Sequence, residues 1–195
     1  MQSIILASQS PRRKLLLEWA EILFDVIIKS TNEDYPSGLS LTETAIHIAR
    51  NKALAVQQEI QIAFHAQHRE KTILAADTIV VLDNVLIGKP KDRADAINIL
   101  QSLSGKVHQV ITGVVLLHNK TEMAFADTTE VSFHPLTNDQ IEFYVDKYQP
   151  YDKAGAYAIQ EWIGVVGIKS VKGDFYNVMG LPVSRVVQAL HTINS

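Results

Sequence analysis

A short polar segment near the N-terminus carries two hydroxyl groups and two guanidinium groups. It reads Ser8-Gln9-Ser10-Pro11-Arg12-Arg13 and lies between an apolar run and an amphipathic stretch. The serine before the proline suits the N-cap of a helix, and a helix start presents unpaired N–H groups with partial positive charge. Because arginine can bind two phosphate oxygens at once, the segment indicates a polyphosphate site. The alternative is a well-capped surface helix with two solvated arginines.

One carboxylate interrupts a nearly continuous apolar run. Asp77 lies within Ile73-Leu74-Ala75-Ala76-Asp77-Thr78-Ile79-Val80-Val81, and burying a charge there is costly unless a partner compensates it. Such an aspartate could hold a divalent cation or activate a water molecule. It could also accept hydrogen bonds from nearby backbone N–H groups, but the apolar surroundings favour a functional role.

Other polar groups are ambiguous when taken alone. Lys89 follows a turn in Gly88-Lys89-Pro90, Lys52 could emerge at the edge of a helical apolar stripe, and Glu33 lies in a polar loop. The small residues of segment 151–160 would let its backbone approach a ligand closely, and Gln160 carries a donor and an acceptor suited to a base edge. A tight buried crossing of the chain explains that segment equally well.

Composition excludes several classes of protein. The 195 residues are 47% hydrophobic and 20% charged, which supports a core. The net charge of −3 and a pI of about 6.1 give no basic footprint for nucleic acid. The absence of cysteine excludes disulfides, thiol catalysis and Cys-ligated zinc. We see no signal peptide and no apolar run approaching the ~18–20 residues of a membrane helix, so we expect a cytoplasmic protein without a membrane partner.

The elements that must position these groups alternate between strands and helices. The patterns predict strands at 4–7, 22–28, 72–82, 108–117, 122–133, 165–171 and 175–178. They predict helices at 14–19, 40–61, 93–103, 137–148 and 182–193. Leu15, Leu16 and Trp19 are the expected inner face of the first helix. Hairpins at 83–84 and 119–120 exclude a purely parallel sheet, so we expect an α/β protein with a mixed sheet.

Taken as a set, these segments resemble the Maf family of nucleoside triphosphate pyrophosphatases, in its dTTP/UTP branch. The motifs that carry the resemblance are 8–13, Ala76-Asp77-Thr78, 88–90, Ser104-Gly105, 152–157 with Gln160, and Gly180-Leu181-Pro182. The resemblance implies hydrolysis of a nucleoside triphosphate to a monophosphate and pyrophosphate. It also implies one Maf-like domain over residues 1–195, with a two-lobed Maf/ITPase-like fold, a central cleft for the ligand, and commonly a homodimer.

The resemblance also implies roles for individual positions. Asp77 matches the proton acceptor, and Glu33 matches an acidic position that helps Asp77 hold Mg²⁺ or Mn²⁺. Positions expected to face phosphate are Ser8, Arg12, Arg13, Lys52 and Lys89, with Ser10 as a further hydrogen-bond donor. Positions that distinguish the dTTP/UTP branch from the branch acting on 7-methyl-GTP are Arg12, Thr78 and Gln160.

Two departures from the family pattern leave alternatives open. The chain reads Thr31-Asn32-Glu33-Asp34 where many relatives have an additional acid before the glutamate, and Glu161-Trp162 where many have glycine-rich sequence. The first weakens the assignment of metal ligands, and the second could alter the base preference. The alternatives are a hydrolase for modified nucleotides, such as 7-methyl-GTP, and a nucleotide-binding regulator of cell division.

Overall fold

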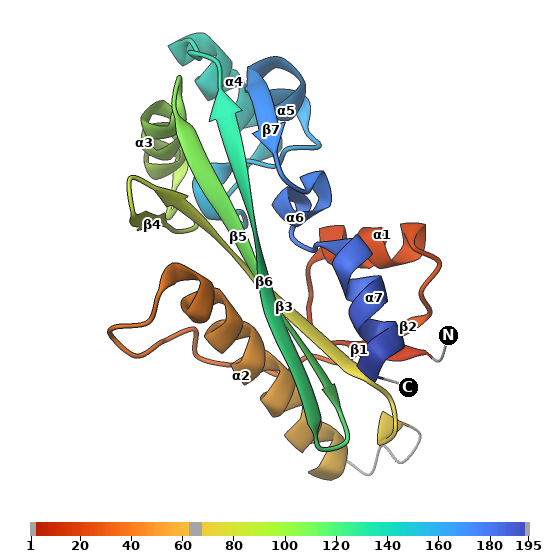
Figure 1. Cartoon of the computed structure of the whole chain (residues 1–195). Helices are drawn as coiled ribbons and strands as arrows, with labels where there is room; N and C mark the ends of the chain where they lie inside the picture. Colours follow the sequence, from red (N-terminus) through yellow and green to blue (C-terminus); the bar gives the residue numbers. More distant parts are fainter. Residues whose placement is uncertain (1–2, 63–67, 194–195) are drawn as a thin grey trace. The chain divides into compact units, whose positions relative to one another are not determined.

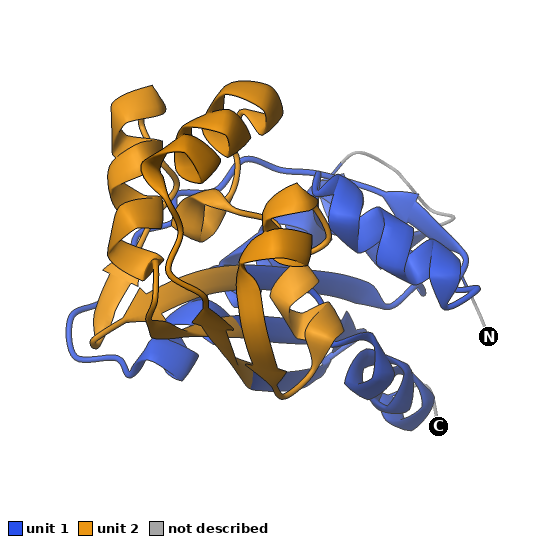
Figure 2. Cartoon of the chain, turned by 90° about the horizontal axis from the view of Figure 1, so that it is seen from above, with its two compact units in different colours: residues 1–77, 112–127, 180–195 blue, residues 78–111, 128–179 orange. Residues whose placement is uncertain are grey.

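The chain divides into two compact units in a computed structural model that describes residues 3–62 and 68–193. Unit 1 comprises residues 1–77, 112–127 and 180–195, and unit 2 comprises residues 78–111 and 128–179 (Figure 2). Each unit combines segments far apart in the sequence because three strands, β3, β5 and β6, run through both. Helices and a mixed sheet confirm the predicted α/β class.

The described residues form a sheet of seven strands (Figure 1). The strands are β1 (Ile4–Leu6), β2 (Phe24–Val26), β3 (Ile73–Leu82), β4 (Val85–Ile87), β5 (Val107–His118), β6 (Thr121–Phe133) and β7 (Ile168–Lys172). Their order is β2-β1-β3-β5-β6-β7, and β4 pairs with β3. Strand β1 is parallel to β2 and β3, whereas β4 and β7 are antiparallel to their neighbours. The sheet is therefore mixed, as the predicted hairpins required.

In unit 1, helices connect the parallel strands. Helix α1 (Pro11–Trp19) joins β1 to β2, and α2 (Leu41–Ile62) lies between β2 and β3 in the sequence. The predicted capping pattern at the start of α2 is confirmed, because Ser40 and Glu43 exchange hydrogen bonds. The core of this unit packs α2 against the sheet through Ile5, Ala7, Ala49, Ala53, Val56, Ile60, Ile73, Ala75, Val115 and Leu117. This packing fixes the helix that carries Lys52.

The C-terminal helix also belongs to unit 1. Helix α7 (Val183–Ile193) follows the predicted range closely, and its buried residues include Val186 and Leu190. Arg185 forms an ion pair with Asp127 and lies 4.3 Å from the ring centroid of Phe125. These contacts attach α7 to β6.

The helices of unit 2 come from the middle of the chain. They are α3 (Arg93–Leu103), α4 (Asn138–Tyr148), the 3₁₀ turn η2 (Ala154–Ala156), α5 (Trp162–Gly167) and α6 (Phe175–Met179). Val80, Val110 and Val131 form a buried cluster on three strands. Arg93 of α3 bonds to Asp146 of α4. The predicted ranges for α3 and α4 are confirmed, including the capping box of Thr137 and Gln140.

The predicted inner face of α1 is partly wrong. Leu16 is buried as expected, but Leu15 is 37% exposed and Trp19 is 59% exposed. The buried face consists of Arg13, Leu16 and Leu17, which follow helical i, i+3, i+4 spacing. The prediction counted only apolar side chains, whereas the guanidinium group of Arg13, held by hydrogen bonds, is part of the buried face.

The predicted strand pair near the C-terminus is also wrong in part. Residues 162–167 form α5 before the strand β7 begins at Ile168, and residues 175–179 form α6. Strand β7 pairs with β6 instead of with a following strand. Short apolar runs such as Ile163–Val166 do not distinguish a strand from a buried helical turn. Strand β2 is shorter than the predicted 22–28.

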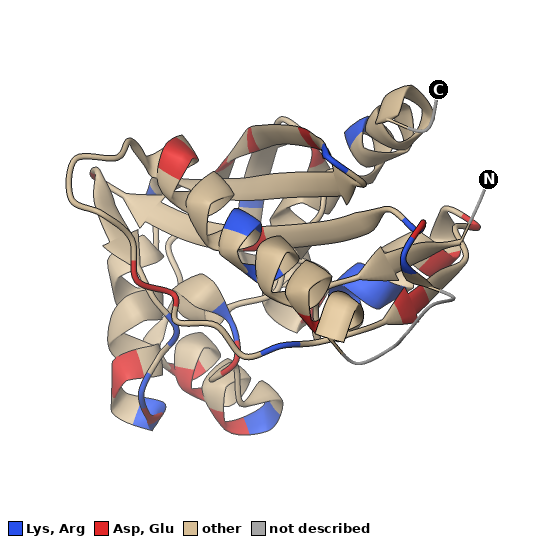
Figure 3. Cartoon of the chain, turned by 90° about the horizontal axis from the view of Figure 1, so that it is seen from below, with Lys and Arg blue, Asp and Glu red and all other residues tan. Residues whose placement is uncertain are grey.

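Charged residues of both signs are spread over the helices and loops of each unit (Figure 3). No helix among the described residues combines the length and the apolar character needed to cross a membrane. Because no single helix or loop stands out by its charge, a candidate site is recognised by which charged side chains are buried and which contact one another.

Candidate active site

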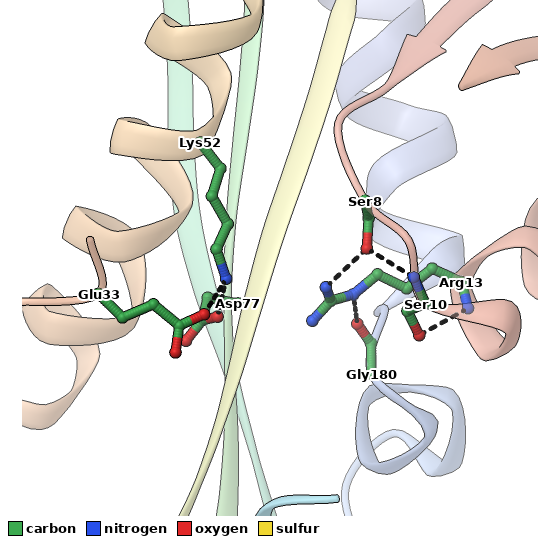
Figure 4. Close-up of polar contacts among 7 residues, drawn as sticks. All are labelled: Ser8, Ser10, Arg13, Glu33, Lys52, Asp77 and Gly180. Carbon is green, nitrogen blue, oxygen red and sulfur yellow. Dashed lines mark hydrogen bonds and ion pairs between the residues drawn. The ribbon is translucent and has the colours of Figure 1, made fainter. Parts of the chain in front are cut away.

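Three charged side chains of unit 1 meet at the end of its part of β3. Lys52 Nζ on α2 donates to Asp77 Oδ1 at 2.6 Å and to Glu33 Oε1 at 2.8 Å (Figure 4). The side chain of Asp77 is 14% exposed and that of Lys52 is 20% exposed, whereas Glu33 is 54% exposed. The ammonium group of Lys52 therefore compensates the charge that Asp77 brings into the apolar strand. One ammonium group thus bonds to two carboxylates, and the three side chains come from three separate segments.

The N-terminal segment forms a second polar cluster in the same unit. Ser10 caps α1 by accepting a hydrogen bond from the backbone N–H of Arg13, and Pro11 begins the helix. Arg13 Nη1 donates to Ser8 Oγ at 3.1 Å, and Arg13 Nε donates to the carbonyl of Gly180 at 2.8 Å (Figure 4). Ser8 Oγ also accepts from the N–H of Ser10. The predicted helix start is confirmed, and the arginine is held in one orientation.

The two clusters interact electrostatically. Burial lowers the pKa of Arg13 to about 10, while the charges of Asp77 and Glu33 act to raise it and the charge of Arg12 acts to lower it. The guanidinium group remains charged at neutral pH, although it has lost much of its hydration. A desolvated cation beside a second guanidinium favours an anion at this place. Arg12 itself is half-buried.

The carboxylates fit a divalent cation bound together with a ligand. Glu33 and Asp77 both bond to one nitrogen, so one cation could contact both. No group of three or more His, Asp or Glu suited to a metal occurs among residues 3–62 and 68–193. Magnesium commonly uses one or two carboxylates and completes its octahedron with water and substrate phosphates. The donor set therefore suits a cation that arrives with a polyphosphate.

The remaining predicted site residues belong to unit 2. Lys89 and Gln160 are exposed, and Thr78 is half-buried in β3 directly after Asp77. The backbone N–H of Gly155 donates to the carbonyl of Gly88 at 3.1 Å, which joins the segment around Lys89 to segment 151–160. The structure thus brings two of the predicted motifs together within this unit. The roles of Lys89, Thr78 and Gln160 stay predictions.

Residue types did not indicate one group that orients Arg13. Gly180 contributes its backbone carbonyl to Arg13, and its φ of 113° is a conformation that favours glycine. A backbone carbonyl is present at every position, so the residue type alone does not reveal this contact. The available signal was the Gly180-Leu181-Pro182 motif, which was noted without a role.

Fold and candidate site together define an α/β protein in which a buried arginine interacts electrostatically with two carboxylates that share one lysine. A family model described as Maf-like protein matches residues 3–193. The chain belongs to this family.

Curated relatives cover most of the chain. The dTTP/UTP pyrophosphatase of Cytophaga hutchinsonii is 46% identical over 96% of this chain and 82% of its own length. Proteins of the same name from Porphyromonas gingivalis and Bacteroides thetaiotaomicron are 44% and 45% identical, over 92% and 94% of this chain and 88% and 92% of their own lengths. Among solved structures, the Ham1 protein of Staphylococcus aureus aligns over 100% of both chains at 17% identity, with a TM-score of 0.48.

Proposed function

We propose that the chain is a nucleoside triphosphate pyrophosphatase that acts on dTTP and UTP. Water is added across the anhydride between the α and β phosphates, and the products are a nucleoside monophosphate and pyrophosphate. Family membership and relatives named dTTP/UTP pyrophosphatase at 44–46% identity support this activity. The observation that carries it is the pair Glu33 and Asp77, which both bond to Lys52. The charges of these two carboxylates also act on Arg13.

The cations of the site bind the triphosphate. Arg13 is oriented by Ser8 and Gly180, so it loses little conformational freedom when an anion binds. Lys52 offsets the charge that accumulates on the phosphates as the anhydride breaks, with Lys89 as a further phosphate contact. Ser8 and Ser10 donate hydrogen bonds to phosphate oxygens.

Asp77 accepts the proton of the attacking water. Its Oδ1 is bonded to Lys52, and the side chain is only 14% exposed, so the carboxylate is held in place at the end of an apolar strand segment. A positioned carboxylate can orient a water molecule and remove its proton as the bond to phosphorus forms. The proton passes to the carboxylate, and the electron pair of the broken anhydride leaves on pyrophosphate.

A divalent cation, Mg²⁺ or Mn²⁺, is the cofactor that these residues fit. Glu33 and Asp77 would hold it together with phosphate oxygens. When bound, it supplies charge neutralisation along the phosphate chain. Lys52 already bonds to both carboxylates, so the cation must share or replace these contacts.

Base selection is assigned to Arg12, Thr78 and Gln160. The amide of Gln160 offers both a donor and an acceptor to a pyrimidine edge. Trp162, which raised the question of an altered preference, packs its ring against Phe143 at 4.8 Å between centroids. This contact gives the tryptophan a packing role within unit 2.

The test is a product analysis with dTTP, UTP, CTP, GTP and 7-methyl-GTP, each with Mg²⁺ or Mn²⁺. We expect dTTP and UTP to give monophosphate and pyrophosphate in equal amounts, with no activity when EDTA removes the cation. Release of a nucleoside diphosphate and inorganic phosphate would overturn the assigned bond cleavage. Preferred hydrolysis of 7-methyl-GTP would assign the chain to modified nucleotides, and binding without hydrolysis would favour a regulatory role.

We further propose a homodimer located in the cytoplasm, as the resemblance implies. Light scattering coupled to size-exclusion chromatography tests the dimer, for which a mass near twice 21.7 kDa is expected. A mass corresponding to a single chain at assay concentrations contradicts it.

A further inference from the structure

A tight turn in unit 2 presents Gln160 to the outside. The backbone N–H of Glu161 donates to the carbonyl of Ala158 at 3.1 Å, so Ile159 and Gln160 occupy the two corners of a four-residue turn. Ile159 is 4% exposed and anchors the turn, whereas Gln160 is exposed. The side chain that the proposed function assigns to the base thus stands at the corner of a defined turn.

Both ends of this turn are tied to one hydroxyl group. Tyr144 lies on α4 and is fully buried, and its hydroxyl accepts a hydrogen bond from the backbone N–H of Ala158 at 3.1 Å. The same hydroxyl donates to Glu161 Oε2. A single buried oxygen therefore fixes the first and the last residue of the turn. Because hydrogen bonds to a carboxylate are stronger than neutral ones, the attachment at Glu161 is the firmer of the two.

The second carboxylate oxygen of Glu161 has its own partner. Lys153 Nζ lies 3.6 Å from Glu161 Oε1 and 2.8 Å from Asp152 Oδ1, and the lysine side chain is only 11% exposed. Glu161 is the N-cap residue directly before α5, and its carbonyl accepts the N–H of Gly164 at 2.9 Å. A methyl group on Gly164 would lie 1.7 Å from the carbonyl oxygen of Ile159, so the chain after the turn is packed against it.

We propose that Tyr144 and Glu161 are positioning residues for base selection. They hold the turn at 158–161 so that the amide of Gln160 faces a nucleobase in one orientation. This inference rests on the proposed function, in which Gln160 contacts the base. It adds that selectivity depends on two side chains that do not touch the substrate. It also gives Glu161, a departure from the glycine-rich pattern of many relatives, a specific purpose.

The experiment compares Tyr144→Phe, Glu161→Ala and Glu161→Gln with the unchanged protein, using dTTP and GTP as substrates. We expect Tyr144→Phe and Glu161→Ala to lower the ratio of kcat/KM for dTTP to that for GTP by roughly three- to tenfold, the value of one hydrogen bond. The change should appear mainly as a higher KM for dTTP, because the turn binds the base and performs no chemistry. Glu161→Gln should restore most of the ratio, since its amide oxygen can still accept from Tyr144.

Tyr148→Phe is the matched control. Tyr148 stacks on Tyr144 at 5.0 Å between ring centroids, yet its hydroxyl has no hydrogen bond to the part of the chain that the structure describes. Removing that hydroxyl should leave the substrate ratio unchanged. A role in stability alone would lower the melting temperature of Tyr144→Phe and reduce activity on both substrates equally.

Double variants with Gln160→Ala separate this inference from the proposed function. If Tyr144 acts through Gln160, adding Tyr144→Phe to Gln160→Ala should not change the ratio further. Additive effects would overturn the inference.

An altered ratio in Gln160→Ala with normal ratios in Tyr144→Phe and Glu161→Ala would also overturn it, while the proposed function stands. An unchanged ratio in Gln160→Ala would overturn both the inference and the assigned role of Gln160. Failure of the unchanged protein to release pyrophosphate from any triphosphate would overturn the proposed function itself. If Tyr144→Phe does not fold, the two Glu161 variants decide.

Discussion

At the scale of single residues, Asp77 is the one charged side chain of an apolar strand. Its carboxylate is stabilised by Lys52, so the strand does not have to bury an uncompensated charge. Asp77→Asn keeps the size of the side chain and removes the proton acceptor. We expect a ~10²–10⁴-fold lower kcat for dTTP, measured as pyrophosphate release at saturating cation.

Asp83→Asn is the matched control for this substitution. Asp83 lies at the end of the same strand with a φ of 51°, which asparagine tolerates well, and its side chain is 77% exposed. Activity should stay within twofold of the unchanged protein. If Asp77→Asn behaved like Asp83→Asn, the proton acceptor would have to be another group.

Arg13 makes contacts that lysine cannot reproduce. The guanidinium group donates at once to the hydroxyl of Ser8 and to the carbonyl of Gly180, from two different nitrogens. Arg13→Lys retains the positive charge but loses the fixed fork of donors. We expect kcat/KM for dTTP to fall by ~10–100-fold, the range of one or two charged hydrogen bonds. Steady-state kinetics measure this, and a loss below threefold would show that charge alone suffices.

Residue types indicated candidate site residues, but they did not indicate the groups that hold them in place. Two hydroxyls, two guanidinium groups and a lone carboxylate were recognisable because their chemistry is unusual for their positions. Lys52 was ambiguous by itself as a lysine in a helix, and only the structure shows its 2.6 Å bond to Asp77. The carbonyl of Gly180 and the hydroxyl of Tyr144 were not recognisable, since a backbone group and a buried tyrosine carry no distinctive pattern.

At the scale of elements, the position of α2 depends on one glycine. A methyl group on Gly113 of β5 would lie 2.3 Å from the carbonyl carbon of Ala45 and 2.4 Å from the nitrogen of Ile46. Backbone atoms cannot move aside as a flexible side chain can. Gly113→Ala should therefore destabilise the protein by ~1–3 kcal/mol, measured by urea denaturation. It should also lower activity, because α2 carries Lys52.

Gly88→Ala controls for the loss of backbone freedom alone. A methyl group at Gly88 meets nothing within 4 Å, and the residue has no positive φ. Its free energy of unfolding should change by less than that of Gly113→Ala. Equal changes in both variants would contradict the close approach as the cause.

Elements with a clear period or cap were predictable, and short apolar ones were not. Helix α4 follows from a capping box, and α3 ends before Gly105, whose φ of 71° suits a glycine beyond a helix end. The segment 162–179 alternates helix, strand and helix within a few residues each. Its conformation is decided in part by the pairing of β7 with residues 130–133 of β6, which lie outside any local pattern.

At the scale of the whole molecule, the division into units falls within the main motif. Asp77 is the last residue of one segment of unit 1, and Thr78 is the first residue of unit 2. Strands β3, β5 and β6 continue through both units, so neither unit is a contiguous piece of chain. The prediction of one domain over residues 1–195 stays a prediction, and the sequence offered no linker at which to divide it.

The stability of the whole molecule should depend on pH through His108. Its ring is 2% exposed, stacks near Phe133, and shares a 2.7 Å hydrogen bond between Nε2 and the hydroxyl of Tyr157, while Nδ1 has no partner among the described residues. Burial lowers the pKa of His108 to about 4. In the unfolded chain a histidine binds a proton below its ordinary pKa of about 6.5, so the unfolded state takes up more protons between these values. Stability from this residue is therefore complete above pH 6.5 and decreases as the pH falls towards 4.

His108→Gln isolates this effect, because glutamine offers Tyr157 a hydrogen-bond partner and does not titrate. Between pH 6.5 and 4 the unchanged protein should lose of the order of 3 kcal/mol more stability than the variant, as measured by urea denaturation at each pH. His134→Gln, at an exposed position, should keep the pH dependence of the unchanged protein. Parallel curves for His108→Gln and the unchanged protein would show that other groups dominate acid unfolding. If the unchanged protein instead loses that much more stability than His108→Gln, the acid sensitivity of the fold is due to one buried imidazole. This imidazole shares a hydrogen bond with Tyr157, in the segment that carries Gln160.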